Sequence, residues 1–196
     1  MNNRNVDWGL IIYHGIKNEE YVKSELKDIE NIKYLNINEE NIDSRKYNII
    51  LTGERFWKTI EEIGCEHALI FQMDAVLLKD DVDEYLEYDY IGAPWSYNKN
   101  NISNNLVGNG GFSLRNTKRM LEIIRNHPYG YVESGNENED IYFSSYVINK
   151  PSTNIAKKFS VETIYYEDPT GMHKPNINNF PSKEHYIKIL SKRIEK

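Results

Sequence analysis

A carboxylate ends one short apolar run of this chain, the segment Ala-Leu-Ile-Phe-Gln-Met-Asp at 68–74. An apolar run bounded by polar residues predicts a buried strand in a parallel sheet. Ligands of open α/β sheets bind outside the carboxyl ends of such strands, where Asp74 can hold a divalent cation against a diphosphate. Gln72 points to the same side of the strand, and the pair can grip a metal and a ribose hydroxyl together. The alternative is that Asp74 only caps the next turn.

A glycine-rich run, Gly108-Asn109-Gly110-Gly111, follows this strand. Glycine lets the backbone approach a ligand closely or adopt positive φ, which favours a binding role for Gly110 and Gly111. The amide of Asn109 offers donors and an acceptor to a sugar hydroxyl. A tight turn explains the same run without any ligand.

An acidic pair, Glu139-Asp140, stands where a helix is predicted to begin. Sugar transfer with inversion needs a carboxylate that takes the proton of the acceptor hydroxyl, so these two are the candidate catalytic bases. The shorter side chain at the helix start gives Asp140 a slight preference. Acidic residues at a helix start are also explained by the helix dipole alone.

Three further side chains complete the candidate set. His173 lies in a predicted loop, and an imidazole with a carboxylate is a workable mixed ligand set for manganese. Lys174 beside it can neutralise a diphosphate as a point charge. Trp95 follows a proline and offers a flat face to a sugar ring, although a core position explains this tryptophan equally well.

The elements that position these residues alternate between strands and helices, which predicts an α/β fold in one domain over residues 1–196. Strands are expected at 8–14, 32–37, 68–74, 89–95 and 112–115. Helices are expected at 19–26, around 47–51 and 56–60, after the cap Asn116 with Met120, Leu121 and Ile124 inward, at 140–147 with Phe143, Tyr146 and Val147 inward, and from Ser182. A short helix and a strand are expected within 156–166, a surface loop at 98–105 and a second loop at 171–175.

Composition excludes several classes of protein. A formal net charge of -6 and the absence of a basic stripe argue against nucleic-acid binding. The single cysteine excludes a disulfide framework and a cysteine-based zinc site. Residues 1–5 lack the apolar core of a signal peptide, and no stretch approaches the roughly 20 apolar residues of a membrane span. We therefore expect a cytoplasmic protein without a transmembrane segment.

The order of the motifs along the chain is more specific than any one of them. Gln-Met-Asp, Tyr-Ile-Gly-Ala-Pro-Trp, Gly-Asn-Gly-Gly-Phe-Ser-Leu-Arg, Glu-Asp-Ile-Tyr-Phe, Phe-Ser-Val-Glu and Gly-Met-His-Lys-Pro occur in that sequence. From about residue 8 to 175 this order resembles DUF5672, a glycosyltransferase-like family related to enzymes of the GT-A fold. The segments 71–74, 89–95 and 108–115 carry the resemblance most distinctively.

The resemblance implies a GT-A-like mixed sheet flanked by helices, a nucleotide-diphospho-sugar donor and a manganese or magnesium ion. It assigns Asp74 in Gln72-Met73-Asp74 and His173 in Gly-Met-His-Lys-Pro to the metal, and Gly110-Gly111 with Glu139-Asp140 to the acceptor side. Two departures accompany it. Gln72 replaces the first acid of the usual metal-binding motif, and the first N-terminal strand of the nucleotide-binding half is expected to be missing.

Three functions remain open at this stage. The leading hypothesis is a metal-dependent transferase that moves a sugar from a nucleotide-diphosphate donor to a hydroxyl of a glycan or protein. The second is a GT-A-like domain that binds a sugar or a partner without catalysis, which Gln72 and the short N-terminus favour. The third is a phosphohydrolase that uses Asp74, but the next acids, Asp80-Asp81, lie far along the chain.

Overall fold

A computed structural model describes residues 7–96, 106–129, 138–174 and 176–191. Its internal contacts divide the chain into two units, residues 1–47 and 48–196, and the single domain expected from the sequence stays a prediction. In the first unit, β1 (Leu10–His14) pairs in parallel with β2 (Ile32–Asn36), and α1 (Glu19–Glu25) connects them. The predicted surface loop at 98–105 lies outside the described residues.

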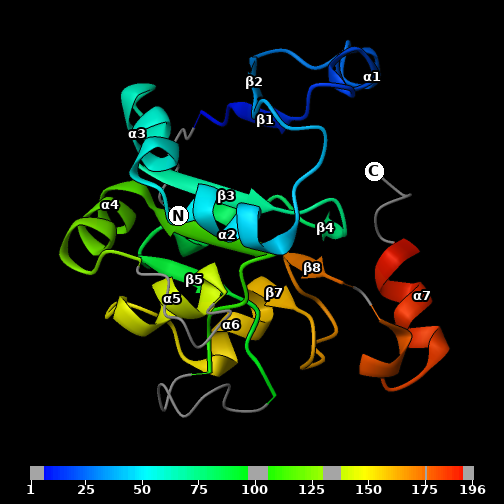
Figure 1. Cartoon of the computed structure of the whole chain (residues 1–196). Coiled ribbons are helices and arrows are strands. Elements are labelled where there is room, and N and C mark those ends of the chain that lie inside the picture. The colour runs from blue at the N-terminus through cyan, green and yellow to red at the C-terminus, as the bar shows by residue number, and fades with distance from the viewer. Residues whose placement is uncertain (1–6, 97–105, 130–137, 175, 192–196) are drawn as a thin grey trace. The chain divides into compact units, whose positions relative to one another are not determined.

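The second unit is a mixture of helices and two small sheets, so the α/β class is confirmed (Figure 1). One sheet has the order β3-β6-β5 and the other β4-β8-β7. The strands are β3 (His67–Phe71), β4 (Ala75–Leu77), β5 (Tyr90–Gly92), β6 (Phe112–Asn116), β7 (Ser160–Val161) and β8 (Gly171–His173). The helices are α2 (Ser44–Leu51), which begins in the first unit, α3 (Glu54–Glu62), α4 (Thr117–Asn126), α5 (Glu139–Tyr146), α6 (Thr153–Phe159) and α7 (Lys183–Ser191), with short 3-10 helices η1 (Val82–Tyr85) and η3 (Ile177–Asn179).

The strand before Asp74 differs from its prediction in two ways. β3 pairs antiparallel with β6, not in parallel, and it lies at one edge of its sheet. Its residues are half-buried, and the side chain of Phe71 at its end is exposed. An edge strand is paired on one side, whereas the apolar run resembles a strand covered on both faces, which explains the wrong prediction.

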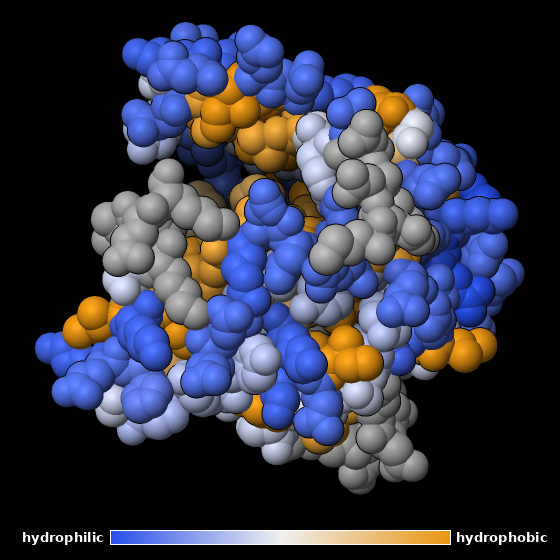
Figure 2. All heavy atoms as spheres, turned by 180° about the vertical axis from the view of Figure 1, so that it is seen from behind, coloured by the Kyte–Doolittle hydropathy of each residue, from blue (hydrophilic) through white to orange (hydrophobic). Residues whose placement is uncertain are grey.

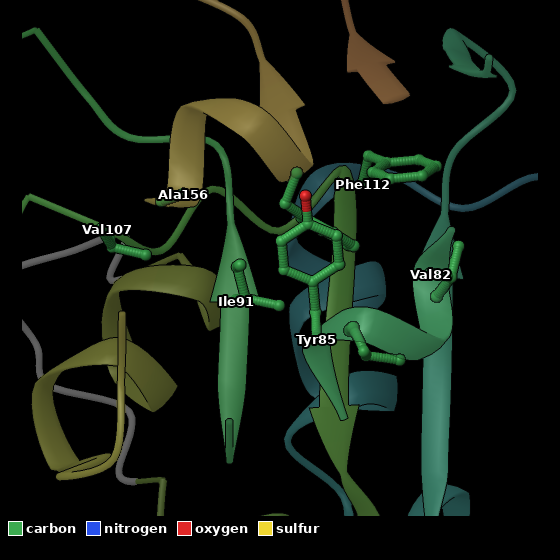
Figure 3. Close-up of a cluster of buried hydrophobic side chains, with 8 residues drawn as sticks. Val82, Tyr85, Ile91, Val107, Phe112 and Ala156 are labelled. Carbon is green, nitrogen blue, oxygen red and sulfur yellow. The ribbon is translucent and has the colours of Figure 1, made fainter. Parts of the chain in front are cut away.

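The core between the sheets and helices gathers side chains from distant segments. Figure 3 shows Tyr85 of η1 between Ile91 of β5 and Phe112 of β6. The ring of Tyr85 meets Phe159 of α6 edge to face, with 5.0 Å between the ring centroids. Phe112 is therefore fixed by the core at the strand end that follows the glycine-rich run.

The helices after β6 agree largely with the predictions from the sequence. The side chain of Asn116 accepts a hydrogen bond from the Arg119 N–H and caps α4 as predicted. Met120 and Leu121 face the core, and Ile124 is half-buried. In α5 the inward positions of Phe143 and Val147 are confirmed, but that of Tyr146 is wrong. Tyr146 is exposed and stacks on His127, with 4.1 Å between the ring centroids.

Hydrophilic residues cover most of the face shown in Figure 2, with smaller hydrophobic areas between them. Across the described residues, none of the helices combines the length and the apolar character that crossing a membrane requires.

Lys150 binds a carbonyl at the C-terminal end of α5, and its pKa predicts a stability that depends on pH. Its ammonium donates to the Ser144 carbonyl at 2.5 Å, one of the last carbonyls of the helix, and burial lowers its pKa to about 8. Between this value and the ordinary pKa of 10.5, the unfolded chain binds more protons than the folded one. Folding should therefore gain stability from Lys150 as the pH rises from about 8 towards 10.5, and this contribution should not change below pH 8.

Urea unfolding of the wild type and of Lys150→Met at pH 7, 8, 9 and 10 measures this effect. Subtracting the two curves removes the titration of every other group. The difference should move in favour of the wild type only above about pH 8. A difference that is flat over the whole range contradicts the lowered pKa of Lys150.

Candidate functional site

The end of β3 and the start of β4 place Gln72 and Asp74. Phe71 is opposite Phe112 in the β3–β6 register, and the next residue, Gln72, donates its N–H to the Gly111 carbonyl at 2.9 Å. The Ala75 N–H donates to the Gln72 carbonyl at 2.9 Å, which closes a tight turn around Asp74. This turn leaves the Asp74 side chain 48% exposed.

His173 reaches Asp74 because β8 pairs antiparallel with β4. In this register His173 is opposite Ala75, the residue after Asp74, and the Lys174 N–H donates to the Asp74 carbonyl at 3.0 Å. The His173 Nε2 atom lies 3.1 Å from Gln72 Oε1 and 3.4 Å from Asp74 Oδ1. The structure thus brings together the two predicted metal ligands, Asp74 and His173, and the predicted substrate-binding residue Gln72.

The setting of His173 differs from the predicted loop. The residue ends strand β8 and is 3% exposed. Polar side chains nevertheless surround its ring on both nitrogens, because Nδ1 lies 3.4 Å from Glu162 Oε1. Strand pairing buries the ring, and the polar neighbours distinguish its position from one in an apolar core.

Glu162 is held by hydrogen bonds of its own. Its Oε2 accepts from the Asn109 side chain at 2.6 Å, and its carbonyl accepts from the Asn179 side chain at 2.5 Å. The other end of the Asn109 amide, Oδ1, accepts the Gly111 N–H at 3.1 Å. Both ends of the Asn109 amide are therefore hydrogen-bonded within the protein, which favours a positioning role over the predicted contact with a sugar.

Two successive glycines lie between the acidic pair and the histidine. A Cβ on Gly111 would overlap the ring of His173, and a Cβ on Gly110 would overlap the carboxylate of Glu139. Close approach of protein side chains, not positive φ, is what requires glycine at these two positions. Because successive Cα atoms are about 3.8 Å apart, the acidic pair and His173 face one short stretch of backbone.

The two acids of the predicted pair have different partners. Glu139 forms a buried ion pair with Arg115 of β6, with 2.5 Å between Nη1 and Oε2 and 3.1 Å between Nη2 and Oε1. The Arg115 guanidinium is fully buried and lies over the ring of Tyr90 at 4.8 Å. Burial raises the pKa of Tyr90 well above its ordinary value, so its neutral hydroxyl donates to the Gly108 carbonyl at 2.7 Å.

Asp140 accepts backbone hydrogen bonds instead. Its Oδ2 accepts the Gly110 N–H at 3.3 Å and its Oδ1 accepts the Ile141 N–H at 2.8 Å. The residue is 9% exposed, at the first turn of α5. Asp140 thus contacts Gly110, and the next residue, Gly111, lies against the ring of His173.

The two remaining predicted substrate-binding residues, Trp95 and Lys174, differ from each other in exposure. Trp95 is 6% exposed, and its Cη2 atom faces Gly108, which favours the packing role over stacking on a sugar. Lys174 is exposed with a positive φ of 44°, directly after His173. The contact of Lys174 with a diphosphate stays a prediction.

The donor atoms at Asp74 fit a divalent cation. A carboxylate, an imidazole and the amide oxygen of Gln72 are ligand types that manganese accepts. A group of three or more histidine, cysteine or acidic side chains arranged to hold a metal does not occur among the described residues. A cation held by Gln72, Asp74 and His173 would therefore have about half of an octahedral shell left for water or a bound anion.

Two residues of the site, Arg115 and Glu162, are absent from the sequence-based candidates. A charged residue inside the short apolar strand 112–116 signals a buried partner. Glu162 directly follows β7, which is the same signal that selected Asp74 after β3.

Comparison with known proteins agrees with this chain's motif order. The family described as "Protein of unknown function (DUF5672)" matches residues 31–173, which is more than half of the chain. The matched range ends at His173 and includes every candidate residue except Lys174. Neither the curated proteins nor the solved structures contain a significant match. On the strength of the family match, the chain belongs to the DUF5672 family.

Proposed function

We propose that this chain is a glycosyltransferase with a GT-A-like fold that moves a sugar from a nucleotide-diphosphate donor to a hydroxyl acceptor. The observation that carries the proposal is the approach of Asp74 to His173, 3.4 Å apart although 99 positions separate them. A half-exposed carboxylate beside a buried imidazole is a site for a cation that a bound anion completes.

Asp74, His173 and the side-chain amide oxygen of Gln72 would hold manganese or magnesium at this site. When bound, such an ion stabilises the negative charge of the leaving diphosphate. Lys174, exposed beside His173, adds a positive charge that can attract the same diphosphate. The donor would therefore bind with its diphosphate at the turn 72–74.

Asp140 is the residue that we assign as the catalytic base. Glu139 neutralises the buried Arg115, and protonating Glu139 would leave that guanidinium without its counter-ion. The Asp140 carboxylate accepts hydrogen bonds from the backbone N–H groups of Gly110 and Ile141. In an inverting transfer, Asp140 would take the proton of the acceptor hydroxyl.

Because the protein supplies few ligands, manganese and the nucleotide should bind cooperatively. Thermal unfolding with UDP, GDP, ADP or dTDP should shift upwards when manganese is added, and each component alone should shift it less. Asp74→Asn should abolish the manganese-dependent part of the shift and leave the melting temperature of the ligand-free protein unchanged, since Asp74 is half-exposed.

A matched control is Asp80→Asn, another exposed aspartate in the segment after β4. This variant should keep the full manganese-dependent shift. An Asp74→Asn protein that also keeps the full shift would refute the assignment of Asp74 to the metal.

A second candidate function is a GT-A-like domain that binds a sugar or a partner without catalysis. Gln72 at the position of an acid, and the small number of charged ligands among the described residues, favour it. The two functions separate in one assay, because the binding domain would show a sugar-dependent shift without releasing nucleotide from any nucleotide-sugar. Nucleotide release that depends on manganese would instead support the transferase.

A further inference from the structure

Glu162 faces the side of His173 that does not face Asp74. The imidazole stands between two carboxylates, with Glu162 3.4 Å from Nδ1 and Asp74 3.4 Å from Nε2. Their surroundings differ, because the Glu162 side chain is 15% exposed and that of Asp74 is 48% exposed. The carboxylate on Nδ1 is fixed in the protein, and the one on Nε2 is open to solvent.

A closed circuit of contacts fixes Glu162. Asn109 donates to Glu162 Oε2 at 2.6 Å and accepts from Gly111, whose carbonyl accepts from the Gln72 N–H at 2.9 Å. The Gln72 side chain then returns to His173 Nε2 at 3.1 Å. These contacts therefore link the orientation of the Glu162 carboxylate to Gln72 and His173, two candidate ligands of the metal site.

A neutral imidazole carries one proton, and its position decides which nitrogen can bind a cation. In the metal-free protein Gln72 Oε1, 3.1 Å from Nε2, can only accept, and Nδ1 has no hydrogen-bond partner among the described residues, so these contacts favour a proton on Nε2. A cation on Nε2 requires the proton to be on Nδ1, where Glu162 Oε1 lies 3.4 Å away. At 3.4 Å the Nδ1 contact is longer than an ordinary hydrogen bond, and a cation on Nε2 would draw the N–H and the carboxylate together.

We propose that Glu162 is a positioning residue that accepts the His173 proton on Nδ1 when a cation occupies Nε2, with Asn109 holding the Glu162 carboxylate in place. The proposal rests on the proposed metal-dependent function. It adds Glu162 and Asn109 to the site as residues that act through His173.

The first measurement is a long-range ¹H–¹⁵N spectrum of the protein without metal and during a titration with Mg²⁺ plus UDP, with the His173 signal assigned by His173→Gln. The wild type should carry the proton on Nε2 without metal and on Nδ1 with it. Glu162→Ala should need a higher Mg²⁺ concentration for this change. Glu162→Gln keeps the shape of the side chain but leaves one oxygen for two donors, so it should give the same effect to a smaller extent.

The second measurement is manganese affinity, by electron paramagnetic resonance with manganese alone and with manganese plus UDP. Glu162→Ala should weaken binding on the order of 10–100-fold, and Asn109→Ala should weaken it less. Glu122→Gln, on α4 and paired with Arg119, is the matched control and should change neither the proton position nor the affinity.

The outcomes separate this proposal from the proposed function. Wild-type affinity for Mg²⁺ and manganese in folded Glu162→Ala and Glu162→Gln overturns the positioning role, even where the metal-dependent function holds. A wild type that binds neither ion in the presence of UDP overturns the metal-dependent function itself.

Discussion

Replacing Arg115 with methionine should lower the free energy of unfolding by about 3–5 kcal/mol, because it leaves the Glu139 carboxylate buried without its counter-ion. The guanidinium is fully buried and Glu139 is 3% exposed, so water cannot substitute for the lost partner. Arg115 also donates to the Ser113 hydroxyl at 2.9 Å, and this bond would be lost as well. Urea unfolding of the two proteins measures the change.

The double variant Arg115→Met/Glu139→Gln is the control that identifies the cause. It removes both charges, so it should regain a large part of the stability that the single variant loses. A single variant within about 1 kcal/mol of the wild type would mean that the pair contributes little, as exposed pairs do. If the double variant is no more stable than Arg115→Met, the loss comes from packing and not from the unpaired Glu139 charge.

The elements of the fold could be predicted where the local pattern decides them. The cap at Asn116 and the inward side chains of α4 follow from residues within one or two turns. The pairing of β3 could not, because its partner β6 begins 41 positions later and an apolar run does not encode the direction of pairing. The strand β8 was missed for the same reason, since its three residues are organised by β4 and not by their own sequence.

The residues of the candidate site likewise divide into those that the local sequence indicates and those whose roles depend on distant partners. Residue type and position at a strand end selected Asp74, and the structure places it beside His173. The register Ala75 to His173 produces this contact, and no periodic pattern in residues 171–175 indicates it. The roles of Glu139 and Asn109 could not be separated from those of their neighbours, because both depend on partners, Arg115 and Glu162, that are distant in sequence.

The buried pair explains why the start of α5 is well placed for chemistry. Arg115 anchors Glu139 to β6, and Asp140 is the next residue of the helix. The Gly110 N–H then fixes the Asp140 carboxylate at 3.3 Å, on the backbone that continues to Gly111 beneath His173. A sugar transferase needs a cation at the leaving group and, if it inverts, a base at the attacking hydroxyl, on opposite sides of the anomeric carbon. In the proposed function, Asp74 takes the first of these roles and Asp140 the second.

Asp140→Asn should therefore lower the rate of sugar transfer on the order of 10²–10⁴-fold, since an amide cannot accept the proton of the acceptor hydroxyl. The amide oxygen can still accept the Ile141 N–H, so the fold should be retained. The manganese-dependent thermal shift with a nucleoside diphosphate should also be retained, because that shift reports the Asp74 side of the site. Glu139→Gln is the matched control, and it should reduce stability through Arg115 more than it reduces the rate of the folded protein. Transfer by Asp140→Asn near the wild-type rate would refute the role of Asp140 as base, and the absence of transfer by the wild type with every donor tested would favour the binding domain.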